Sequence, residues 1–290
     1  MFNVIYSFHM PLFFFISGSV RALHGEYQQG FRVFCNTIGK RFYALVVPSI
    51  VWSSIVPLFC LNTADFSFSL KSGYWFLNTL FVIDFLWDVF SFVKVKFKKK
   101  FFFSIIALAL IAIFFVLGIK RISISYLIMY IIGFYFQRYN FIKKMNGYIY
   151  SFLLLIFLLF VGSFRYGYDI SGSPERVWLQ MPLSICASFC LVYFFSIWEL
   201  SKGKIFTVLG FLGRYTLGIY LAHFAFVKIG DLGYMENNLN LLLQYSILLV
   251  VAVVISLLCV GIQYVLKPFG LLYSLMYGKL FMKKRNECNR

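Results

Sequence analysis

The chain has 290 residues, of which 61% are hydrophobic, 22% aromatic and only 13% charged, and its mean hydropathy is +0.84. This composition excludes an ordinary soluble domain, because 38 phenylalanines and 20 tyrosines cannot all be buried in one aqueous core of this size. The formal net charge is +17, but the basic residues form short clusters between apolar runs, which is typical of membrane loops and argues against a nucleic-acid partner.

Apolar runs near 20 residues long follow one another along the whole chain. An α-helix of about this length crosses ~30 Å of hydrocarbon, and backbone groups in lipid must be paired within the helix. The expected spans are 4–20, 42–61, 74–93, 101–119, 122–138, 148–164, 178–198, 214–230 and 241–266. The sequence therefore predicts an all-α, polytopic membrane bundle of about nine helices, organised as one domain over residues 1–290.

The charges of the loops indicate the orientation of these spans. Basic residues concentrate after the first, third, fifth and seventh spans and in the C-terminal tail, whereas the second, sixth and eighth loops are balanced or slightly acidic. The fourth loop departs from this pattern with Lys120 and Arg121, but it is too short to outweigh the others. By the positive-inside rule the C-terminus is cytoplasmic and residue 1 lies outside, in a multi-pass protein of the plasma (inner) membrane. Because residue 1 is not followed by a recognisable signal peptide, we expect that one further helix precedes it in a ten-helix parent.

The first span contains an ionisable side chain, in the string F-H-M-P-L-F-F-F-I-S-G at 8–18. An imidazole at the head of an apolar run is a functional candidate, because polar groups are unfavourable in hydrocarbon. Pro11 predicts that His9 lies in the first helical turn, where a missing amide hydrogen is tolerated. Two interpretations of His9 remain open: part of an acceptor site, or a cap at the membrane interface.

The third span carries four polar or aromatic candidates. Trp75 and Asn78 share a face at its outer start, where Trp75 is either an interfacial aromatic or a stacking platform for a sugar ring. Asp84 and Asp88 follow one turn apart, with Asp84 ~15 Å from the outer end at the rise of an α-helix. Carboxylates at that depth need a cation, a proton or water, so we expect either ion pairs with arginine or lysine from other spans or a proton relay.

The eighth span begins at Arg214 and presents Thr216, Tyr220 and His223 on one face, at spacings of four and three residues. His223 should lie ~13 Å along the helix from Arg214. A polar stripe at that depth lines either a cavity or a helix contact. In the cavity interpretation His223 is a base near neutrality, and Tyr220 and Thr216 orient its ring or contact the substrate.

The sequence contains no motif for a metal or a nucleotide cofactor. The six cysteines lack metal-ligand spacing, and neither a phosphate-binding loop nor a zinc-protease signature is present. Cys186 and Cys190 share a helix face, which we interpret as packing. We therefore expect neither a metal site nor a bound cofactor.

Four strings, in order along the chain, resemble the acyltransferase-3 family of membrane acyltransferases, in the branch of fucose 4-O-acetylase-like and polysaccharide O-acetyltransferases. They are the opening string at 8–18, K-R-F-Y-A-L-V-V-P at 40–48, Y-W-F-L-N-T-L-F-V at 74–82 and L-G-R-Y-T-L-G-I-Y-L-A-H at 212–223. The family's first helix, which bears an arginine and the histidine usually regarded as catalytic, has no counterpart in this sequence.

The resemblance implies transfer of an acetyl group from acetyl-CoA, a substrate held at the cytoplasmic face, to a hydroxyl of a surface polysaccharide or its lipid-linked precursor. His9 and His223 are then the candidate catalytic residues. Arg41 and Arg214 lie within the matching strings, where a planar guanidinium suits the phosphates of the donor; snorkelling anchors are the other interpretation. The expected partners are the lipid bilayer, acyl-CoA and the glycan acceptor.

Two other functions remain open. A transporter or polysaccharide exporter would also carry aspartate and histidine within its spans, but we find neither an inverted repeat nor a matching pair of broken spans. An inactive, N-terminally truncated acyltransferase is the second alternative, because the family's first helix has no counterpart here.

Overall fold

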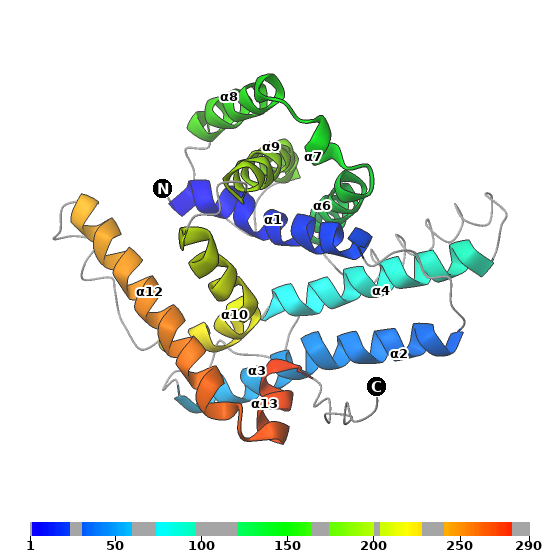
Figure 1. Ribbon diagram of the computed structural model, residues 1–290, viewed down its shortest axis with the longest axis vertical. Coiled ribbons are helices and arrows are strands. Elements are labelled where there is room, and N and C mark those ends of the chain that lie inside the picture. The colour runs from blue at the N-terminus through cyan, green and yellow to red at the C-terminus, as the bar shows by residue number, and fades with distance from the viewer. Residues whose placement is uncertain are drawn as a thin grey trace. The chain divides into compact units, whose positions relative to one another are not determined.

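A computed structural model of the chain describes residues 2–23, 31–59, 74–96, 121–163, 174–199, 204–227 and 241–279. These residues are almost entirely helical and include no strand, which confirms the all-α class (Figure 1). The helices are α1 (Phe2–Leu23), α2 (Phe31–Arg41), the π-helix η1 (Phe42–Val46), α3 (Val47–Phe59), α4 (Trp75–Lys96), α6 (Arg121–Arg138), α7 (Phe141–Lys144), α8 (Gly147–Ser163), α9 (Pro174–Glu199), α10 (Lys204–Val227), α12 (Leu241–Leu266) and α13 (Gly270–Tyr277).

Eight of the nine expected spans overlap these helices, and the remaining one, 101–119, lies outside the described residues. The agreement is closest for α12, whose bounds are those expected from its apolar run. Among the described residues, two helical segments are long and apolar enough to cross a membrane, Trp75–Phe92 and Ser246–Leu266. These two segments support a membrane protein, and the larger number of spans stays a prediction.

The segment before the second span differs from expectation. We expected a loop there, but α2, η1 and α3 form one continuous helical stretch from Phe31 to Phe59. None of the α2 residues is buried, and Arg32, Asn36 and Lys40 interrupt its apolar residues, so this helix lacks the apolar run by which the others were found. Within η1 the Val47 amide donates to the Phe42 carbonyl, five residues back, and Pro48, which has no amide hydrogen to donate, follows directly.

The helices group into two compact units. One comprises Met1–Gln29 with Leu86–Phe206, and the other comprises Gly30–Phe85 with Thr207–Arg290. Helix α4 contributes residues to both units, because the division falls inside it. The expectation of a single domain over residues 1–290 stays a prediction.

In the first unit, α1 and α6 touch backbone to backbone. A Cβ atom on Gly18 would collide with the carbonyl oxygen of Tyr130, and one on Gly133 would collide with that of Phe15. The Ser19 hydroxyl donates to the Gly133 carbonyl oxygen at 3.0 Å across the same contact. Small residues permit this close approach, which is a common way for helices to associate in a membrane.

In the second unit, α13 packs on η1 and α3. The Trp52 indole nitrogen of α3 donates to the Met276 carbonyl oxygen at 2.8 Å, and the Tyr43 and Ser274 hydroxyls are also 2.8 Å apart. After α13, Gly278 adopts a φ of 64° directly against the Ala44 carbonyl, where a Cβ atom would collide. A glycine is required there both by the left-handed backbone and by the lack of space.

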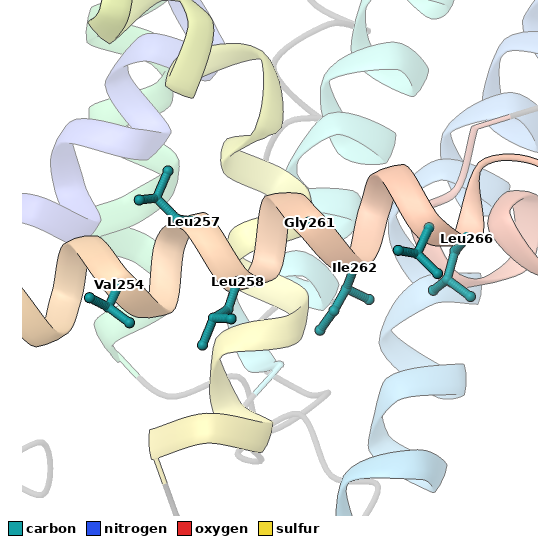
Figure 2. A pocket seen from close by; sticks show the side chains of 7 residues that line it. Val254, Leu257, Leu258, Gly261, Ile262 and Leu266 are labelled. Atoms are coloured by element: carbon teal, nitrogen blue, oxygen red, sulfur yellow. The ribbon is translucent and has the colours of Figure 1, made fainter.

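The outer side of α12 is an exposed apolar face. Val254, Leu258 and Ile262 point to the same side of the helix, and Gly261 leaves a notch beside them (Figure 2). A shallow hollow of about 570 Å³ lies along this face, and the described residues that line it belong to α12. Side chains of this kind suit contact with lipid tails and contribute no polar chemistry.

Candidate active site

Two residues of the polar face of α10, Tyr220 and His223, lie together in the second unit, with ring centroids 5.7 Å apart. His223 is half-buried, and its Nδ1 lies 2.6 Å from the Tyr220 carbonyl oxygen and 3.2 Å from that of Ile219. A carbonyl oxygen can only accept a hydrogen bond, so Nδ1 carries the proton of the neutral ring. The lone pair is therefore on Nε2, the atom that can act as a base.

Tyr220 also packs against the beginning of α4. Its ring meets those of Phe76 and Tyr74 edge-on, with centroids 5.5 and 6.2 Å apart. The buried Tyr74 hydroxyl donates to the Leu221 carbonyl oxygen at 2.8 Å, within the turn of α10 that leads to His223. These edge-on ring contacts and the hydrogen bond fix the orientation of the Tyr220–His223 pair.

Sequence reasoning did not single out Tyr74 as a site residue. Its only signal was its place as the first letter of the string at 74–82, directly before Trp75. A buried tyrosine in such a string reads as core packing, because the sequence does not reveal which carbonyl its hydroxyl reaches. The structure assigns it a second role, as a support for the α10 turn.

Trp75 and Asn78, the two candidates at the start of α4, contact different neighbours. Trp75 is half-buried, and its ring lies edge-on to that of Phe76 with centroids 6.4 Å apart. The Asn78 side-chain oxygen accepts a hydrogen bond from the buried Ser49 hydroxyl of α3 at 2.9 Å. Asn78 therefore joins α4 to α3, and a role of either residue in substrate binding stays a prediction.

Arg41, the last residue of α2, has a carboxylate close to its guanidinium. Its Nη1 lies 3.7 Å from Oδ1 of Asp84 on α4, and the two side chains are 20% and 16% exposed. This contact lies within the second unit and agrees with the interpretation of Asp84 as a member of an ion pair. Arg41 is thus a cation that is paired and still partly accessible.

The structure corrects the expected position of Arg214. Helix α10 begins at Lys204, ten residues before Arg214, so this arginine lies inside a helix rather than at its end. The apolar character of residues 204–213 lets the helix continue upstream, despite two glycines that each weaken a helix by about 1 kcal/mol. Arg214 and Thr216 are both exposed, and the Thr216 hydroxyl donates to the Gly213 carbonyl oxygen at 2.8 Å.

The expected position of His9 is also wrong. Helix α1 begins at Phe2, so His9 lies in the interior of this helix rather than in its first turn, and Pro11 is an internal proline. Proline has no amide hydrogen, so Pro11 removes one hydrogen bond from the ladder of this helix. His9 is half-buried in the first unit, and its role in an acceptor site stays a prediction.

The first unit contains a second arginine–aspartate pair. Arg21, in the last turn of α1, donates from Nη2 to Oδ1 of Asp88 at 2.6 Å, and the side chains are only 9% and 1% exposed. Arg21 directly follows the first expected span, 4–20, and was therefore expected in the basic first loop; the structure instead places it inside α1, where a buried charge needs a partner of this kind. Beside the pair, the Trp87 ring packs on those of Phe134 and Tyr130, with centroids 4.5 and 5.9 Å apart.

Within the described part of the chain, histidine, cysteine, aspartate and glutamate side chains form no cluster of three or more that could hold a metal ion. The cysteines described there are free thiols, and Cys186 and Cys190 are buried on α9. The polar groups described at the candidate site are imidazole, guanidinium, carboxylate and hydroxyl groups.

Two comparisons with known proteins each give a match that covers most of the chain. A family model described as an acyltransferase domain, Acyl_transf_3, matches residues 1–261, a range that includes every candidate site residue. The nodulation protein NolL of Mesorhizobium japonicum is 25% identical over 314 aligned residues, which cover 96% of this chain and 80% of that protein. No solved structure matches the chain.

Proposed function

Because the chain belongs to the acyltransferase-3 family and is therefore an acyltransferase, we propose that it moves an acetyl group from cytoplasmic acetyl-CoA to a hydroxyl of a surface polysaccharide or its lipid-linked precursor. The observation that carries this proposal is the Tyr220–His223 pair, in which the ring proton is fixed on Nδ1. Transfer to a sugar hydroxyl needs a base near neutrality, and a neutral imidazole with its lone pair on Nε2 meets that need.

In the proposed reaction, Nε2 of His223 takes the proton of the acceptor hydroxyl as the hydroxyl oxygen bonds to the acyl carbon. The bond between that carbon and the sulfur of CoA breaks, and the thiolate leaves with its electron pair. As the ring becomes cationic, its Nδ1–H keeps donating to the Tyr220 carbonyl oxygen, which stabilises the protonated ring. Tyr74 and Phe76 hold the turn that carries this ring.

Arginine residues are proposed to bind the donor. Arg41 is the stronger candidate, because its guanidinium is partly accessible and its planar fork matches a phosphate. Arg214 is exposed on α10 and is the second candidate. Trp75, Asn78 and Thr216 are proposed contacts of the acceptor sugar, with the half-buried Trp75 ring as a platform for stacking. For His9, which belongs to the first unit, a catalytic role is proposed separately.

We further infer that the protein is a multi-pass protein of the plasma membrane with a cytoplasmic C-terminus. The two apolar helical segments and the exposed face of α12 support a membrane location, and the distribution of basic residues supports the orientation. This orientation would present basic side chains to acetyl-CoA in the cytoplasm. An outward-facing acceptor glycan would then receive the acetyl group.

The decisive test is acetyl transfer by the full chain in lipid nanodiscs, with radiolabelled acetyl-CoA and a cell-envelope glycan fraction as acceptor. His223→Asn keeps an amide that can donate to the Tyr220 carbonyl but removes the base. We expect it to lower the rate of transfer by about 100-fold or more, with a normal yield of folded protein. An active His223→Asn variant would remove this residue from the chemistry.

Tyr215→Phe is the matched control on the same helix. The Tyr215 hydroxyl is paired with that of Tyr264 at 2.8 Å, away from the ring of His223, and its removal should leave transfer nearly unchanged. Uptake of glycan into vesicles without acetylation would instead indicate a transporter. A folded chain that neither acetylates nor transports would be the inactive alternative.

A further inference from the structure

Two aspartates one turn apart on α4 are each paired with an arginine, but the two pairs differ in length and in exposure. The Arg21–Asp88 pair is short, at 2.6 Å, and almost fully buried. The Arg41–Asp84 pair is longer, at 3.7 Å, and both of its side chains are partly exposed. One pair is closed to any ligand, and the other is open to one.

The geometry of the second pair is that of charge attraction without a short hydrogen bond. A distance of 3.7 Å between Nη1 and Oδ1 exceeds the range of an N–H···O hydrogen bond, which ends near 3.2 Å. Partly exposed pairs of this kind typically shift an equilibrium by no more than about fivefold. A phosphate bound by both arms of a guanidinium is held more strongly, through parallel charge-assisted hydrogen bonds.

The backbone also keeps Arg41 in place for such an exchange. It ends α2 and is followed at once by η1, whose wide turn is closed by the hydrogen bond from the Val47 amide to the Phe42 carbonyl. The Tyr43 hydroxyl and the Ser274 hydroxyl lie 2.8 Å apart and tie the same turn to α13. The arginine side chain can therefore change its anionic partner without a change in the helix that carries it.

We propose that Asp84 is an exchangeable counter-ion of Arg41, which neutralises the guanidinium in the empty enzyme and yields it to a phosphate of the acyl-CoA donor. Asp84 is thus a positioning residue that acts through Arg41 and tunes the affinity for the donor. This inference rests on the proposed function, because it takes acyl-CoA as the ligand of Arg41. It differs from the proton-relay interpretation, in which the Asp84 carboxyl itself carries a proton during turnover.

The test is the binding of CoA to the purified full chain in nanodiscs, measured by calorimetry at low salt. Asp84→Asn removes the competing charge, so we expect the dissociation constant for CoA to fall three- to tenfold. Arg41→Gln should raise it, and the double variant Arg41→Gln/Asp84→Asn should bind CoA as weakly as Arg41→Gln alone. Glu199→Gln, a loss of one negative charge at the end of α9, controls for net charge and should bind CoA like the wild type.

A tightening that disappears when Arg41 is absent supports the proposal, as does acetyl transfer by Asp84→Asn at saturating acetyl-CoA. Unchanged or weaker binding by Asp84→Asn overturns it, because a merely structural carboxylate would give that result. Tightening that persists in the double variant also overturns it, since the effect would then not pass through Arg41. Loss of transfer by Asp84→Asn at saturating acetyl-CoA overturns the proposal in favour of the relay, even where CoA binds tightly. A wild-type chain that binds no CoA removes the proposed function as well.

Discussion

Asp84 and Asp88 carry the same charge one turn apart on a single helix, but their surroundings give the two arginine pairs different properties. Around Asp88, Arg21 is 9% exposed and the contact is 2.6 Å. Around Asp84, Arg41 is 20% exposed and the contact is 3.7 Å. The chemical groups are identical, so packing alone separates a pair that fastens the fold from one that remains accessible. Burial, rather than residue type, is the better guide to which charges in a membrane protein are available for binding.

The largest loss of stability should come from breaking the buried Arg21–Asp88 pair. Asp88→Asn removes the carboxylate that the buried Arg21 guanidinium contacts at 2.6 Å, and we expect a loss of about 3–5 kcal/mol of stability. Thermal unfolding in detergent, followed by tryptophan fluorescence, measures this loss. The double replacement Arg21→Met/Asp88→Leu removes both charges and should recover most of it, whereas a wild-type melting curve for Asp88→Asn would contradict the assignment.

A smaller loss of stability should follow when the packing of α1 on α6, near the Arg21–Asp88 pair, is disturbed. Gly18→Ala places a methyl group on the Tyr130 carbonyl, so α1 and α6 must move apart, at an expected cost of about 1–3 kcal/mol. Gly261→Ala is the matched control, because a Cβ atom there meets open space on α12. Equal melting temperatures for the two variants would show that the close approach of α1 and α6 is unimportant.

In the second unit the expected change is smaller again. Tyr74→Phe removes one buried hydrogen bond to the Leu221 carbonyl, which should lower stability by about 1 kcal/mol. Because that bond supports the turn leading to His223, kcat should fall more than the KM for the donor changes. The same measurements on Tyr264→Phe, whose hydroxyl is exposed, should show neither effect; an unaltered kcat in Tyr74→Phe would restrict the residue to packing.

The smallest change in stability is expected when the partly exposed Arg41–Asp84 pair is broken. Asp84→Asn breaks a partly exposed contact of 3.7 Å, and the expected loss is below about 1 kcal/mol. The difference in melting temperature between Asp84→Asn and Asp88→Asn therefore measures what burial adds to the same interaction. If both variants lose stability equally, the contrast between the two regions is not real.

The sequence was most informative where a single physical signal dominates. Apolar runs located the helices, because a lipid-facing or buried helix must be apolar along its length, and α12 was placed at both ends. Helix α2 could not be found in this way, since Arg32, Asn36 and Lys40 interrupt its apolar residues. The first expected span, 4–20, lies within α1, but His9 was wrongly placed in the first helical turn because Pro11 was taken to mark that turn, whereas Pro11 lies inside the helix.

The candidate site was predictable only in part, because the sequence shows which residues share a helix face but not which distant residues contact each other. The i, i+3 spacing put Tyr220 and His223 on one face of a helix, and the rings are indeed neighbours. The partners of Asp84 and Asp88 were not predictable, because the chain offers 27 lysines and arginines and tertiary packing chooses among them. The support from Tyr74 likewise depends on a contact between residues 147 positions apart.

The wide turn of η1 has a consequence for how this protein can change by insertion or deletion. Because Phe42–Val46 holds one residue more than a regular turn, the wide turn absorbs that residue and keeps the helix upstream in the phase of an ordinary α-helix. Losing a single residue inside this segment would restore ordinary winding and leave the Arg41 side chain directed toward α4. Losing a residue from the regular winding of α3 would instead rotate everything upstream by about 100° about the axis. Segment 42–46 is thus the part of this long helical stretch that best tolerates a change of length by one residue.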